Sequence, residues 1–83
     1  MTIYLVEDDE IYAEFIKKSL SGDGRVFSVF HSAEEGLPAL QRALPDVLII
    51  DYKLPGISGI DLYEKLKPRL KEENKVIMLS SLE

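Results

Sequence analysis

The chain has 83 residues, enough for one small domain, and a net charge of -5 at neutral pH. Hydrophobic residues make up 46% of it and charged residues 30%, a composition that favours a folded globular chain over a disordered one. The acidic balance disfavours partners that are bound through positive charge, so we expect no direct contact with nucleic acid and none with a membrane.

Targeting and cysteine chemistry are also constrained by the sequence. No apolar run approaches the roughly 20 residues of a membrane span, and no secretion signal is visible. The absence of cysteine excludes disulfides and thiolate zinc sites, and the single histidine cannot form a histidine cluster. We expect a cytoplasmic protein.

The first half of the chain alternates between strand and helix patterns. Residues 3–6 form a continuous apolar run, typical of a strand buried on both faces of a parallel sheet. The run ends in four acids at 7–10, after which apolar residues follow helical spacing until residues 21–24 stop the helix. A second short strand is expected over 26–30. The helix between these two strands is predicted to bury one face, made of Ile11, Phe15, Ile16 and Leu20.

The second half continues this alternation. Ser32 and Glu35 form a capping box that opens a helix, within which a proline at position 38 is expected to cause a kink or an early end. Pro45 ends that helix, and a strand over 47–50 leads into Asp51. A turn-rich loop over 52–59 precedes a helix that Pro68 closes or kinks, and a last strand over 76–79 ends in two serines.

Strands that alternate with helices predict a parallel sheet with helices on both faces. Ligands of such sheets bind at the carboxyl ends of the strands, where this sequence places Glu7, Asp8, Asp51 and Ser80. Clustered carboxylates repel one another, and a divalent cation relieves that repulsion. Sparse oxygen ligands favour Mg²⁺, with the backbone carbonyl of Lys53 as a possible neutral ligand. Beside the metal, Asp51 could act as a nucleophile toward a phosphoryl group, with the Ser80 hydroxyl bound to a phosphoryl oxygen.

The chain resembles the receiver domain of two-component response regulators. Three segments carry the resemblance, in order and spacing, across essentially the whole sequence. Residues 3–10 are an apolar strand ending in an acid pair, residues 46–59 are a strand followed by Asp-x-x-x-Pro-Gly-x-x-Gly, and residues 76–81 are a strand followed by serine.

The resemblance implies an α/β, flavodoxin-like, doubly wound parallel sheet with the strand order 2-1-3-4. It implies that Asp51 accepts a phosphoryl group from a histidine kinase or a phosphotransfer protein. Glu7 and Asp8 match the family's acid pair, which holds Mg²⁺ together with Asp51 and the Lys53 carbonyl. Ser80 matches the hydroxyl residue that contacts the phosphoryl group and helps to switch the domain, and the serine after it matches a small residue that leaves room for the donor.

The chain departs from the family at its carboxyl end. Family receivers have five strands and five helices, whereas residues 1–83 are expected to form a single receiver-like domain lacking the fourth helix, fifth strand and fifth helix. No position matches the family's lysine on the fifth strand or its aromatic switch residue. The apolar edge of the fourth strand is therefore predicted to cause self-association, as in a dimer. The other interpretation is that the chain is a fragment of a longer protein.

Three functions compete on these observations. The first is a phosphoacceptor that catalyses its own phosphotransfer and is not a turnover enzyme. The alternative is a receiver fragment that cannot be phosphorylated and acts as a dimerising or protein-interaction module. A phosphatase with an aspartate nucleophile is disfavoured, because Lys53 rather than an acid stands two positions after Asp51.

Overall fold

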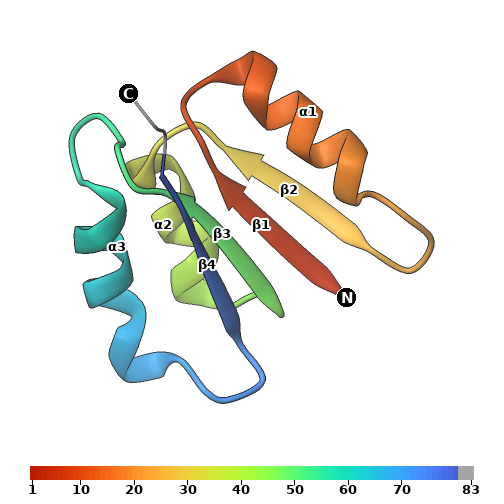
Figure 1. Cartoon of the computed structure of the whole chain (residues 1–83). Coiled ribbons are helices and arrows are strands. Elements are labelled where there is room, and N and C mark those ends of the chain that lie inside the picture. The colour runs from red at the N-terminus through yellow and green to blue at the C-terminus, as the bar shows by residue number, and fades with distance from the viewer. Residues whose placement is uncertain (81–83) are drawn as a thin grey trace.

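The computed structural model describes residues 1–80, and residues 81–83, including the predicted donor-side residue Ser81, lie outside the described part. Strands and helices alternate as the sequence predicts (Figure 1). In chain order they are β1 (Thr2–Val6), α1 (Glu10–Leu20), β2 (Val26–Phe30), α2 (Ala33–Arg42), β3 (Val47–Asp51), α3 (Gly59–Leu66), the short 3-10 helix η1 (Lys67–Arg69) and β4 (Lys75–Leu79).

The four strands form one parallel sheet in the order β2-β1-β3-β4, which confirms the predicted α/β topology. The first strand lies between its two partners, so that Leu5 is paired with Val29 on one side and with Ile49 on the other. Because all strands point the same way, their carboxyl ends gather at one end of the sheet, which we call its carboxyl end.

Helices cover both faces of the sheet, with α1 on one face and α2 and α3 on the other (Figure 1). Two hydrophobic cores result, which explains why the strands are nearly continuous apolar runs. The core under α1 contains Ile3, Leu5, Ala13, Ile16 and Ile49. The core under α2 and α3 contains Val6, Ala33, Leu40, Leu48, Ile50, Leu54, Leu62 and Leu66.

The predicted buried face of α1 was wrong for three of its four residues. Ile16 is buried, but the side chains of Ile11, Phe15 and Leu20 are 86%, 66% and 37% exposed. The helix contacts the sheet through Ala13 and Ile16 instead. Each residue turns an α-helix by about 100°, so positions 11 and 15 both point almost directly away from Ala13. The small side chain of Ala13 is a weak apolar signal in the sequence, although it lets the helix lie close to the strands.

The proline at position 38 does not end α2, which continues for a further turn to Arg42. Pro38 is exposed and has no N–H to donate to the carbonyl of Glu34. The helix ends at Ala43, whose N–H donates to the carbonyl of Ala39. Proline also shapes the end of α3, because the helix stops at Leu66 and Pro68 lies in the short helix that follows.

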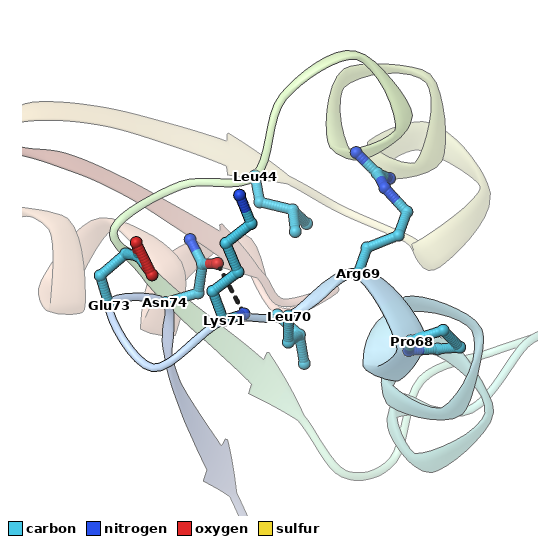
Figure 2. Close-up of a pocket in the computed structure, with 7 residues that line it drawn as sticks. All are labelled: Leu44, Pro68, Arg69, Leu70, Lys71, Glu73 and Asn74. Atoms are coloured by element: carbon cyan, nitrogen blue, oxygen red, sulfur yellow. Dashed lines mark hydrogen bonds between the residues drawn. The ribbon is translucent and has the colours of Figure 1, made fainter.

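Side-chain hydrogen bonds hold the connection from η1 to β4, and Figure 2 shows the one within it, between Asn74 and Lys71. The side chain of Asn74 accepts from the Lys71 N–H at 3.0 Å and donates to the Pro45 carbonyl at 2.9 Å. Arg69 donates to the carbonyl of Leu40 near the end of α2 at 2.9 Å. Within the described residues, no helix is long and apolar enough to cross a membrane.

Candidate functional site

Three carboxylates meet where β1 and β3 end. Glu7 and Asp8 directly follow β1, and Asp51 is the last residue of β3, the strand beside it. Carboxylate oxygens of the three side chains all lie within 4.8 Å of one another. The sequence predicted this meeting from the ends of the first and third strands, and we call these three residues the acid cluster.

Local hydrogen bonds hold the turn that carries the first two acids. The Glu7 N–H donates to the Phe30 carbonyl at 2.9 Å, which keeps residue 7 in line with the sheet. A carboxylate oxygen of Glu7 then accepts from the Asp9 N–H at 3.2 Å. Asp9 caps α1 by accepting from the Tyr12 N–H at 3.0 Å, so the chain turns directly from the strand into the helix.

The acid cluster is electrostatically strained at Glu7. The side chain of Glu7 is 3% exposed, and the pKa of its carboxyl is raised from the ordinary 4.5 to about 7, chiefly by burial. The nearby Asp51 and Asp8 side chains contribute to this rise, while the hydrogen bond from the Asp9 N–H opposes it. The cluster therefore favours either a proton or a bound cation at this place.

The acid cluster opens into a hollow of about 360 Å³ at the same carboxyl end of the sheet. A hydrogen bond of 2.7 Å from the Tyr52 N–H to the Leu79 carbonyl joins the chain after β3 to the end of β4. The chain after β3 also turns back on the cluster, because the Lys53 N–H donates to Asp51 Oδ1 at 3.3 Å. The lining residues are Glu7, Asp8, Asp9, Tyr12, Asp51, Lys53, Leu79 and Ser80.

All five predicted site residues of the described chain thus lie together. Three further residues line the same hollow and were not predicted as site residues, namely Asp9, Tyr12 and Leu79. The helix cap at Asp9 could have indicated Tyr12, because a cap places the third residue after it in the first turn, beside the acids. Among the residues that line the hollow, Lys53 carries the one basic side chain.

A larger hollow of about 610 Å³ lies at the opposite end of the sheet, beside the segments that lead into β3 and β4. Figure 2 shows its lining, to which Arg69, Lys71 and Glu73 contribute charged side chains. The described residues form one cluster of carboxylates, and that cluster lies at the other end of the sheet, away from this hollow. Size alone therefore does not mark the site; the placement of the acids does.

Comparison with known proteins agrees with this fold. The family model "Response regulator receiver domain" matches residues 3–83. The phosphate regulon transcriptional regulatory protein PhoB of Rhizobium meliloti is 36% identical over 80 residues, which are 95% of this chain and 35% of that protein. The transcriptional regulatory protein CreB of Escherichia coli is 41% identical over 68 residues, which are 78% of this chain and 28% of that protein. The chain thus spans about a third of the length of these relatives.

Solved structures show the same likeness. The receiver domain of the Francisella response regulator 1452 has a TM-score of 0.83 and 29% identity, over 99% of this chain and 67% of that one. The response regulator TrrA of Thermotoga maritima, solved in complex with Mg²⁺-BeF, has a TM-score of 0.85 and 27% identity, over 98% of this chain and 70% of that one. On its sequence, its fold and the acids at its strand ends, the chain belongs to the response regulator receiver domain family.

Proposed function

We propose that Asp51 accepts a phosphoryl group from a phosphohistidine of a histidine kinase or of a phosphotransfer protein, in a Mg²⁺-dependent reaction. The observation that carries the proposal is the acid cluster, in which Asp51 lies within 4.8 Å of two further carboxylates and lines an open hollow with them. Membership of the receiver family supports the class of partner.

The donor set of the acid cluster fits Mg²⁺. It offers carboxylate oxygens and no nitrogen or sulfur, and its strained Glu7 carboxyl favours a neighbouring positive charge. The residues that would hold the ion are Glu7, Asp8 and Asp51, together with the backbone carbonyl of Lys53. A bound Mg²⁺ ion supplies positive charge that offsets the negative charge of the acids and of the phosphoryl oxygens.

The chain's own residues then have distinct parts in the transfer. A carboxylate oxygen of Asp51 attacks phosphorus, the bond from phosphorus to the donor's imidazole nitrogen breaks, and its electron pair stays on that nitrogen, which takes up a proton. The product is an acyl phosphate on Asp51. Ser80 also lines the hollow, and its hydroxyl donates to a phosphoryl oxygen and so senses the new group. Each chain takes one phosphoryl group, which makes it a phosphoacceptor rather than a turnover enzyme.

Intact mass spectrometry after incubation with phosphoramidate, with and without Mg²⁺, tests this function. We expect a single phosphoryl adduct that requires Mg²⁺ and is absent from the Asp51→Asn variant. The matched control is Asp61→Asn, which changes an exposed acid in the first turn of α3 and should leave the adduct unchanged. A folded wild-type chain that forms no adduct would overturn the proposal.

We also propose that the chain associates with itself along β4. Within residues 1–80 this strand pairs with β3 on one side and has no strand on its other side. The other edge strand, β2, is contacted by α1 on one face and by α2 on the other. On the α1 face of β4, by contrast, Ile77 is 48% exposed. An apolar edge with free backbone groups favours pairing with a second copy.

Sedimentation velocity over a range of protein concentrations tests this association. The wild-type chain should sediment as a dimer at high concentration, and the Ile77→Lys variant should shift toward the monomer, because a lysine beside an open edge opposes strand pairing. Val26→Lys places the same charge on β2, where Val26 is 63% exposed, and should leave the dimer intact. A wild-type chain that stays monomeric at all concentrations would contradict the proposal.

A further inference from the structure

The loop over residues 52–58, which joins β3 to α3, is fixed firmly at its two ends. Near its start, Leu54 is buried in the core under α2 and α3. At its end, Ser58 caps α3 by accepting from the Asp61 N–H at 3.1 Å, and the Gly59 N–H donates back to the Tyr52 carbonyl at 3.3 Å. The stretch between these anchors, at Pro55 and Gly56, is exposed.

One side chain from another element holds this exposed stretch. Glu34, in the first turn of α2, accepts from the Ile57 N–H through Oε2 at 3.3 Å, across 23 positions of sequence. Gly56 lies against the same oxygen, since a Cβ at this position would come within 2.5 Å of Glu34 Oε2. Gly56 also has a φ of +72°, a conformation that favours glycine. The loop therefore fits around the Glu34 carboxylate.

The start of α2 does not require Glu34. Ser32 caps the helix by accepting from the Glu35 N–H at 3.0 Å, and the Glu35 carboxylate accepts in return from the His31 N–H at 3.0 Å. These two bonds satisfy backbone donors at the start of α2 without any part played by Glu34. An acid in a first turn gains a little from the helix dipole wherever its carboxylate points. The contact with the loop thus needs a further explanation.

We propose that Glu34 is a positioning residue for the phosphoacceptor site. By holding Ile57, it keeps the loop closed on α2, and this loop carries Lys53, whose N–H binds Asp51 and whose carbonyl is the proposed metal ligand. The inference rests on the proposed function, because it concerns how well the same site binds Mg²⁺.

Amide hydrogen exchange of Ile57 and Mg²⁺ titration followed by amide chemical shifts, measured in Glu34→Ala and Glu34→Gln, test this role. In Glu34→Ala we expect the Ile57 amide to exchange about three- to tenfold faster and the Mg²⁺ dissociation constant to rise by a similar factor, as for the loss of one hydrogen bond. Glu34→Gln retains an oxygen acceptor, so its Ile57 exchange rate and its Mg²⁺ dissociation constant should match those of the wild-type chain. Glu14→Ala, which removes an exposed acid from α1, controls for net charge and should change neither.

The possible outcomes separate the two proposals. If the wild-type chain binds Mg²⁺ and forms the adduct, but Glu34→Ala matches it in Ile57 exchange or in Mg²⁺ affinity, the positioning role is wrong and the proposed function stands. If Glu34→Gln behaves like Glu34→Ala, the hydrogen bond is not the cause, which also overturns the role. A wild-type chain that neither binds Mg²⁺ nor forms the adduct overturns both proposals.

Discussion

At the scale of single residues, Glu7 links the site to the stability of the chain. Its carboxyl has a pKa of about 7 in the folded chain and of 4.5 ordinarily, mainly because it is buried. Between these two values the folded chain keeps a proton that the unfolded chain has lost. The metal-free fold should therefore lose stability as the pH rises from about 4.5 to about 7, and change no further through this group above that.

We expect the loss to be about 2–3 kcal/mol in the free energy of unfolding. Urea unfolding of the wild-type chain and of Glu7→Gln, between about pH 5 and pH 8 and without divalent metal, measures it. The stability of the wild type relative to the variant should fall across this range, because glutamine does not titrate. A difference that stays constant with pH would show that Glu7 ionises at its ordinary pKa.

Gly59 gives a second prediction at this scale, because it lies against the backbone of Asp51. A Cβ at this position would run into the backbone carbonyl of Asp51 and approach Ile50 Cγ2 at 3.0 Å. Gly59→Ala should therefore destabilise the fold by about 1–3 kcal/mol, although alanine normally favours a helix. Urea unfolding checks this value. At the control position Gly22 a Cβ meets nothing closer than 3.7 Å, so Gly22→Ala should change stability little, and equal losses at both positions would contradict the steric explanation.

At the scale of elements, the sequence predicts the strands better than the helix faces. Each strand is a short apolar run ended by a charge, a turn or a serine, and that pattern is explicit in the residues. The face of α1 depended on tertiary contact instead, because Ala13 rather than Ile11 meets the sheet. The site followed from strand ends in a parallel sheet, whereas the contact of Glu34 with the loop has no sequence signal at a separation of 23 residues.

The proline within α2 yields a prediction for that element. Pro38→Ala restores a donor to the Glu34 carbonyl, a gain that the greater freedom of the unfolded chain partly offsets. We expect a net stabilisation of about 1–2 kcal/mol by urea unfolding, and more helical signal by circular dichroism. Gln41→Ala, at another exposed position of the same helix, should stay within about 0.5 kcal/mol of wild type. A Pro38→Ala variant no more stable than Gln41→Ala would show that the missing donor is without cost.

At the scale of the whole molecule, metal binding should appear as global stability, because the acid cluster joins two strands at the centre of the sheet. Mg²⁺ at ten times its dissociation constant should stabilise the fold by about 1.4 kcal/mol and raise Tm by roughly 5–10 °C. Asp8→Asn should abolish this rise, while Glu10→Gln, an exposed acid outside the cluster, should keep it. Thermal unfolding with and without Mg²⁺ measures this rise in Tm. An equal rise in Asp8→Asn and Glu10→Gln would show that the ion binds outside the acid cluster.

The central place of β1 also has a consequence for synthesis of the chain. The first strand made can pair with β2 as soon as residues 26–30 emerge from the ribosome, but its other partner comes later. Glu7 and Asp8 are therefore translated early and remain an incomplete pair of acids until Asp51 and the end of β3 have emerged. A nascent chain thus completes its acid cluster and the second side of its central strand in one step.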